Sequence, residues 1–182
     1  MSTARSALLE RIIEEAAAGG LADRSLREIA EGAGTSHRML IYHFVSRAGL
    51  VAAVVETIEA AQRDLLVELS AEVSTATELM MALWRRVSAP ELRPFVRLFF
   101  ECVAATGGEG LTDPWLEMAN SVAQTLSEDY DADQLRLGVA VTRGLLIDVL
   151  ATGDADAATR SMERFIEMWQ ATSPAAVSTE LA

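Results

Sequence analysis

Apolar residues recur every three or four positions along most of the chain, which is the spacing of one face of an α-helix. The first such segment predicts a helix over 4–18, terminated by Gly19 and Gly20. Further helices are predicted over 46–70, 74–88, 91–106, 112–128, 132–152 and 155–171. Two short helices between residues 18 and 46 complete the pattern, which predicts an all-α fold of about nine helices.

The two short helices are predicted from the chemistry of residues 25–44. Ser25 can cap the first free amides of a helix, and Glu28 has the spacing to accept a hydrogen bond from the cap amide. Gly34 can adopt the positive φ of a tight turn, after which Thr35 or Ser36 caps a second helix. Two short helices joined in this way form a helix-turn-helix.

The expected seam between these helices leaves one side of the second helix exposed. The seam residues are Leu26, Ile29, Ala33 and Leu40, with Ala30 at the crossing point. An exposed helix of this kind fits the major groove of DNA. Arg38 can contact a guanine, while Met39 and Ile41 can pack on thymine methyls. The candidate DNA-contacting residues are Arg27, Ser36, His37, Arg38, Met39, Ile41, Tyr42, His43 and Arg47. The alternative is a helical hairpin with a structural role alone.

The stretch from about Leu8 to Val55 resembles the TetR family of transcriptional regulators. The matching motifs are Ser25-Leu26-Arg27-Glu28-Ile29-Ala30, Gly34, Ser36, Leu40-Ile41-Tyr42-His43-Phe44, and Ser46-Arg47 with Leu50. The chain departs from the family pattern at three places. Ile41 occupies the usual tyrosine position, Thr35 replaces a valine, and Ala16 replaces a phenylalanine.

This resemblance implies a DNA-binding domain at 1–46, followed by a helical ligand-binding and dimerisation domain at 47–172. We expect residues 173–182, which lack a sustained apolar pattern, to be a frayed tail. The resemblance also implies a repressor, released from a palindromic DNA operator by a small apolar or amphipathic effector. The alternative function is a helical protein-interaction or sensor module that does not read DNA.

The helix predicted over 132–152 is apolar nearly all round, so it must be covered on two sides. Together with the last helix it could form half of a four-helix homodimer interface, and the resemblance implies the same. The candidate interface residues are Leu135, Val139, Leu146, Met162, Phe165, Ile166 and Trp169. The alternative is a core within one chain. A twofold dimer would place two reading helices on successive major-groove turns of a palindrome.

The middle of the chain is rich in aromatic residues and methionine, which can line an adaptable apolar cavity. Candidate ligand-binding residues are Met80, Trp84, Phe95, Phe99, Cys102, Trp115, Met118 and Arg143. Ordinary core packing is the alternative for each apolar member. Arg143 has apolar neighbours, so we expect either a ligand carboxylate or a salt bridge across the core.

Charge is divided unequally along the chain, whose net charge is -12. The first fifty residues hold six arginines and six acidic residues, so the excess acidity belongs entirely to the remainder. Local attraction to phosphate is therefore compatible with an acidic protein.

Other functions lack the residues that they need. The two histidines both lie in the helix-turn-helix, and no metal-ligand, phosphate-loop or nucleophile-elbow motif occurs, so we expect no enzyme activity, metal or cofactor. A single cysteine excludes an internal disulfide and favours the cytoplasm. Glutamates among the first fifteen residues are atypical of a signal peptide, and no apolar run is long enough to span a bilayer.

Overall fold

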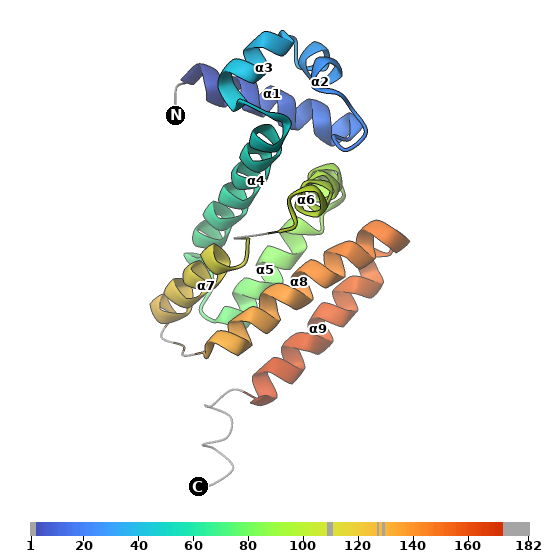
Figure 1. Cartoon of the computed structure of the whole chain (residues 1–182). Coiled ribbons are helices and arrows are strands. Elements are labelled where there is room, and N and C mark those ends of the chain that lie inside the picture. Colours follow the sequence, from blue (N-terminus) through green and yellow to red (C-terminus); the bar gives the residue numbers. More distant parts are fainter. Residues whose placement is uncertain (1–2, 109–110, 127, 129, 173–182) are drawn as a thin grey trace, which may run out of the picture. The chain divides into compact units, whose positions relative to one another are not determined.

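The computed structural model describes residues 3–108, 111–126, 128 and 130–172, and within these ranges it contains helices and no strands (Figure 1). The elements are α1 (Thr3–Gly19), α2 (Leu26–Gly32), α3 (His37–Phe44), α4 (Arg47–Ser70), α5 (Ala76–Val87), the 3₁₀ turn η1 (Pro90–Leu92), α6 (Arg93–Thr106), α7 (Asp113–Thr125), α8 (Ala132–Thr152) and α9 (Ala155–Thr172). The predicted all-α fold is confirmed. The expected frayed tail, 173–182, lies outside the described residues.

Most helix bounds agree with the sequence pattern, and the differences have local causes. The helix predicted from residue 91 begins instead at Arg93, after the separate turn η1. Pro94 explains this shift, because a proline is tolerated in the first turn of a helix but collides with the preceding turn farther along. Gly107 and Gly153, both in the left-handed conformation, cap α6 and α8 at their C-terminal ends.

The chain divides into two compact units, and the division differs from the predicted boundary at residue 46. The first unit comprises Met1–Gln62 and Glu91–Glu109, and the second comprises Arg63–Pro90 and Gly110–Ala182. Helix α6 therefore belongs with the N-terminal helices, because it packs against α1. Sequence periodicity identified α6 as a helix but could not reveal which helices it contacts.

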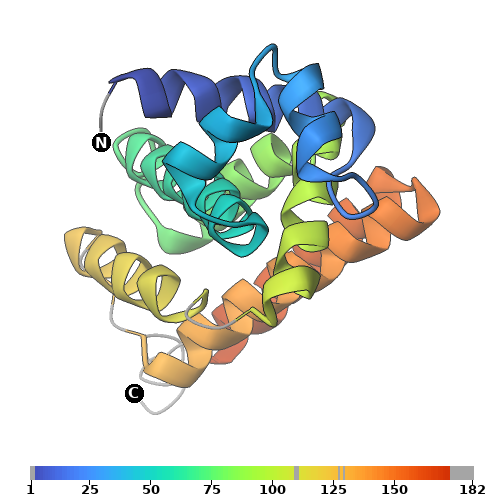
Figure 2. The ribbon, with the colours of Figure 1, turned by 45° about the horizontal axis from the view of Figure 1, so that its top comes forward.

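The core of the first unit forms where α1, α2 and α3 gather around the start of α4 (Figure 2). The predicted stripe on α1 is buried as expected, and it consists of Leu8, Leu9, Ile12, Ile13 and Ala16. Leu40 and Leu50 close the core from α3 and α4, while Leu98 and Cys102 contribute from α6. Burial of these side chains is the main term that holds the short helices α2 and α3 in place.

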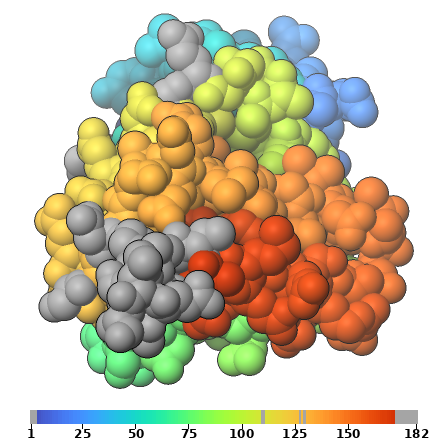
Figure 3. All heavy atoms as spheres, turned by 90° about the horizontal axis from the view of Figure 1, so that it is seen from below, coloured from blue at the N-terminus to red at the C-terminus, as the bar shows by residue number. Residues whose placement is uncertain are grey.

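The second unit packs α8 against both α7 and α9, and α9 also contacts α5. Trp84 of α5 is fully buried and donates its indole N–H to Thr159 Oγ1 on α9 at 2.9 Å. Gly138 of α8 allows the Trp169 ring to approach, since a Cβ at this glycine would lie 3.2 Å from that ring. The surfaces of α8 and α9 lie side by side in the space-filling view (Figure 3).

No single helix among the described residues is long and apolar enough to cross a membrane. The pair α3 and α4, bent by 68° at the break between them, would meet the requirement on combined length and composition alone.

Candidate nucleic-acid interface

Helix α2 begins at the predicted cap. The Ser25 hydroxyl accepts a hydrogen bond from the Glu28 amide at 3.3 Å, and the Glu28 carboxylate accepts one from the Ser25 amide at 2.7 Å. The Ser25 hydroxyl also donates to the Glu28 carboxylate at 2.6 Å, and this bond, together with that from the Ser25 amide, stabilises the charged carboxylate and lowers the pKa of Glu28 below its usual value. The reciprocal capping box fixes the first turn of α2.

The turn between α2 and α3 has the geometry that the sequence predicts. Gly34 has a φ of 64°, and its amide donates to the Glu31 carbonyl, while the Thr35 amide donates to the Ala30 carbonyl at 2.8 Å. These two bonds form a Schellman motif, which ends a helix and reverses the chain in one residue of left-handed conformation. Ser36, the second of the two predicted caps, then accepts from the Met39 amide and starts α3.

The seam between α2 and α3 sorts the side chains into two sets. Ile29, Ala30, Ala33 and Leu40 are buried, whereas Leu26 is half-buried. On the other side of α3, the exposed residues are Ser36, His37, Arg38, Met39, Ile41 and Tyr42, of which Tyr42 is 75% exposed. The structure thus places six of the predicted DNA-contacting side chains of this segment outward, and only His43 is half-buried.

Arginine residues in the first unit fall into a structural set and a free set. Arg11 donates to the Ala33 carbonyl at 3.2 Å, and Arg24 binds the Glu15 carboxylate, an interaction that raises the pKa of Arg24. Arg5 donates to the His43 carbonyl and lies 5.0 Å from the centre of the Phe44 ring. In contrast, Arg27 and Arg38 are exposed and make no hydrogen bond or ion pair with any described residue.

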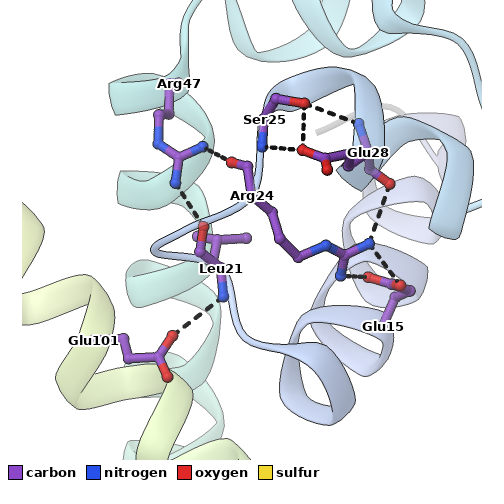
Figure 4. Close-up of polar contacts among 7 residues, drawn as sticks. All are labelled: Glu15, Leu21, Arg24, Ser25, Glu28, Arg47 and Glu101. Atoms are coloured by element: carbon purple, nitrogen blue, oxygen red, sulfur yellow. Dashed lines mark hydrogen bonds and ion pairs between the residues drawn. The ribbon is translucent and has the colours of Figure 1, made fainter.

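Arg47 differs from the prediction that it faces phosphate. Its guanidinium donates to the carbonyls of Leu21 at 2.5 Å and of Arg24 (Figure 4). It also donates to the Ala22 carbonyl at 2.8 Å. The planar guanidinium carries five N–H donors, so it can bind several carbonyl oxygens at the same time. Arg47 therefore anchors the α1–α2 loop, and the free cations of the interface reduce to Arg27 and Arg38.

The junction of α3 and α4 contains a conformation that the sequence did not signal. Val45 has a φ of 66°, and the Ser46 amide donates to the Phe44 carbonyl at 2.7 Å, which closes a γ-turn of the rare, strained type. Gly49 lies against the same carbonyl, because a Cβ there would be 2.2 Å from the Phe44 oxygen. This tight junction fixes the angle between α3 and the start of α4.

The predicted ligand-binding residues are divided between the two units. Phe95, Phe99 and Cys102 belong to the first unit, and Met80, Trp84, Trp115, Met118 and Arg143 to the second. Trp84, Phe99 and Cys102 are buried, as the core alternative predicts, and burial raises the pKa of the Cys102 thiol to about 11. Trp115 is also buried, yet its indole N–H has no hydrogen-bond partner among the described residues.

Arg143 is half-buried and supports the start of α7. Its guanidinium donates to the Leu111 carbonyl at 3.2 Å and to the Thr112 hydroxyl at 3.3 Å. Both of these acceptors are uncharged oxygen atoms just before α7.

The predicted dimer residues lie mainly on the faces that α8 and α9 turn toward their own unit. Leu146, Met162 and Trp169 are buried within the chain, and Leu135, Val139, Phe165 and Ile166 are half-buried. The three buried residues are covered within one chain, in helices that pack against one another, which is the arrangement that the core alternative expects. The exposed apolar side chains are different ones, namely Leu137 and Ile147 on α8 and Met168 on α9.

Comparison with known proteins agrees with this geometry. Residues 8–54 match the family of bacterial regulatory proteins named tetR. A putative TetR-family transcriptional regulator from Rhodococcus sp. has a TM-score of 0.72 at 22% identity, and the match covers 92% of this chain and 98% of the other. A TetR-family transcriptional regulator from Pectobacterium atrosepticum has a TM-score of 0.72 at 21% identity, with 91% of each chain covered.

A third similar structure is the multidrug binding protein EbrR complexed with ethidium, with a TM-score of 0.68 at 21% identity. The match covers 89% of this chain and 97% of that one. No curated protein sequence matched the chain.

Proposed function

The chain carries a tetR-family domain within the fold of TetR-family transcriptional regulators, and on this premise we propose that it is a homodimeric repressor, not an enzyme. It binds a palindromic operator through α3 and leaves it when a small apolar or amphipathic effector binds. The observation that carries this proposal is the outward face of α3, where polar, apolar and cationic side chains are all exposed beside a capped helix N-terminus.

Each exposed side chain of this face suits a different part of a DNA groove. Arg38, with no protein partner among the described residues, can give two parallel hydrogen bonds to a guanine. Met39 and Ile41 can contact thymine methyls, and Tyr42 and Arg27 can reach phosphates. The free amides of the first turn of α3 add a favourable site for a phosphate oxygen.

The acidic charge of the chain limits non-specific binding. Four of the six arginines in the first fifty residues bind protein groups, which leaves Arg27 and Arg38 to attract phosphate. With so few free cations, sequence-independent affinity stays modest and falls only gradually as the salt concentration rises. Selectivity for an operator then rests on base contacts more than on general attraction.

The effector is proposed to bind the second unit. EbrR, a structural relative, binds ethidium, which supports an amphipathic aromatic ligand for this fold. In this chain the unused Trp115 indole N–H is a buried donor that a ligand acceptor atom could satisfy. An effector lowers operator affinity only by preferring a dimer whose two α3 helices are spaced wrongly for the palindrome.

The homodimer is proposed to form through an exposed stripe on α8. Its members, spaced by three and four residues, are Leu137, Ala140, Gly144, Ile147 and Ala151. This spacing is that of a coiled-coil seam, and the small central residues allow close approach of a second helix. Of the interface residues predicted from sequence, Leu135, Val139 and Leu146 also lie on α8 but outside this stripe, and the other four lie on α9.

Selection of duplexes from a random pool, followed by gel-shift titration, tests DNA reading. Arg38→Ala should weaken binding to the selected duplex at least about tenfold and relax preference at one base pair. Arg27→Ala should weaken binding to all duplexes by a similar factor and make binding less dependent on salt. Arg160→Ala, at an exposed position of α9, serves as the charge-matched control. Unchanged binding in Arg38→Ala would exclude the groove assignment. Failure of the wild type to enrich any sequence would favour the interaction-module alternative.

A further inference from the structure

The backbone of Leu21 connects two helices of the first unit. Its amide donates to Glu101 Oε2 of α6 at 3.1 Å, and its carbonyl accepts from Arg47 Nη2 of α4 at 2.5 Å (Figure 4). Both partners are charged, and hydrogen bonds to charged groups are stronger than those between neutral groups. One peptide residue therefore bridges α6 and α4 through opposite ends of its backbone.

The rest of the loop is fixed to the same bridge and leads directly into α2. Gly20 adopts a φ of 76° and lies against Glu101, so that a Cβ there would be 3.6 Å from Oε2. Beyond Leu21, Arg47 also binds the Ala22 and Arg24 carbonyls. The Arg24 side chain in turn donates to the Glu28 carbonyl inside α2 at 3.1 Å. A shift of α6 relative to α4 would therefore change the position of the first turn of α2.

Both charged partners act on the same buried thiol. Burial is the main cause that raises the pKa of Cys102, the negative charge of Glu101 raises it further, and the positive charge of Arg47 lowers it. Glu101 also lines an open groove of about 300 Å³ formed by the end of α1, the α1–α2 loop and α6. Water can therefore reach the carboxylate, and the bond to Leu21 can open without unfolding the unit.

We propose that Glu101 is a positioning residue for DNA reading, which holds the Leu21 bridge closed and thereby sets the orientation of α2 and of the α3 helix packed on it. The proposal rests on the proposed function as a DNA-binding regulator. Glu101 contacts no DNA in this scheme. When its bond to Leu21 is lost, the loop keeps its bonds to Arg47 but is no longer tied to α6, and α2 samples orientations that present Arg27 and α3 less well to an operator.

Amide hydrogen exchange in the full-length chain tests the structural half of this proposal. Glu101→Ala should speed exchange of the Leu21 amide roughly tenfold and also speed exchange in α2, over Ile29–Gly32. Glu101→Gln, which keeps an acceptor oxygen, should restore most of the protection. Arg97→Ala is the matched control, since Arg97 lines the same groove one turn earlier and binds no described residue.

Affinity for a duplex selected by the wild-type protein tests the functional half. Glu101→Ala should bind about tenfold more weakly, Glu101→Gln nearly as tightly as the wild type, and Arg97→Ala unchanged, all at a temperature where each variant is fully folded. If the wild type selects no duplex, the proposed function fails. If the wild type selects one and Glu101→Ala binds it equally tightly, only the role of Glu101 fails. Unchanged exchange in α2 of Glu101→Ala would also overturn that role.

Discussion

At the scale of single residues, the junction of α3 and α4 has the least room for change. Gly49 lies in the first turn of α4, where its missing Cβ leaves space for the Phe44 carbonyl oxygen. That oxygen already accepts the Ser46 amide of the γ-turn at Val45, so it cannot move away without loss of the turn. The constraint at Gly49 comes from a backbone atom, which yields less readily than a flexible side chain.

Replacement of this glycine should therefore destabilise the protein even though alanine favours helices. We expect Gly49→Ala to lower the free energy of unfolding by about 1–3 kcal/mol, as for overpacked sites. Ala52→Ser, at an exposed position of the same helix, should change it by less than about 0.5 kcal/mol. Urea unfolding followed by circular dichroism measures both. Equal stability of Gly49→Ala and the wild type would show that the junction relaxes freely.

Single residues also show where sequence reasoning reached its limit. Ser25, Glu28 and Gly34 act on neighbours within a few positions, so their roles followed from spacing alone, and spacing narrowed the cap of α3 to Thr35 or Ser36. The role of Arg47 depends on carbonyls more than twenty residues away. An arginine beside a DNA-reading helix suits phosphate and protein carbonyls equally well, and only the fold decides between them.

At the scale of elements, α2 and α8 both begin with a capping box, but the acidic member is the N3 residue in α2 and the N-cap residue in α8. In α2 the reciprocal partners are Ser25 and Glu28, and in α8 they are Asp131 and Gln134. Glu28 is exposed, and its bonds to Ser25 hold its pKa below the ordinary value of 4.5. A carboxyl with a lowered pKa in the folded state stabilises that state when ionised.

This contribution should be complete above pH 4.5 and should vanish as pH falls through the lowered pKa of Glu28. Glu28→Gln keeps the box geometry, as Gln134 does in α8, and removes the charge. We therefore expect the wild type to be slightly more stable than Glu28→Gln at neutral pH, with the difference shrinking below pH 4.5. Chemical unfolding at a series of pH values measures this difference. A difference that grows toward acid would contradict the assigned sign.

Elements were easier to predict than their partners. Each helix carries its own periodicity and end signals, which is why α8 was located correctly from sequence at 132–152. Its nearly continuous apolar surface could not show which face meets α9 and which remains exposed. In the structure, the face of α8 that contains Gly138 packs against Trp169 of α9, whereas Leu137 and Ile147 remain exposed. Likewise, α6 was predicted as a helix but not as a partner of α1.

At the scale of the whole molecule, operator reading requires two copies of α3 held at a fixed spacing, and one chain supplies only one. The exposed stripe on α8 is the surface that we propose to supply the contact. Leu137 is 52% exposed and Ile147 is 51% exposed, which is unusual for large aliphatic side chains that are spaced on one helical face. A second copy would remove both from water through one symmetric interface.

A charge in this stripe should separate the copies without unfolding them. Ile147→Glu places one carboxylate per chain in an apolar interface, where burial without a partner costs several kcal/mol. We expect sedimentation equilibrium to show a dimer for the wild type and a monomer for Ile147→Glu at micromolar concentration, with equal helicity by circular dichroism. Asp148→Asn, at the exposed neighbouring position, controls for a change of charge beside the stripe and should remain dimeric.

The monomer should also lose binding to a full palindrome much more than to a half-site, because only a dimer links the two reading helices. A wild-type protein that sediments as a monomer would exclude the dimer, whereas a dimeric Ile147→Glu would mean that the interface uses another face.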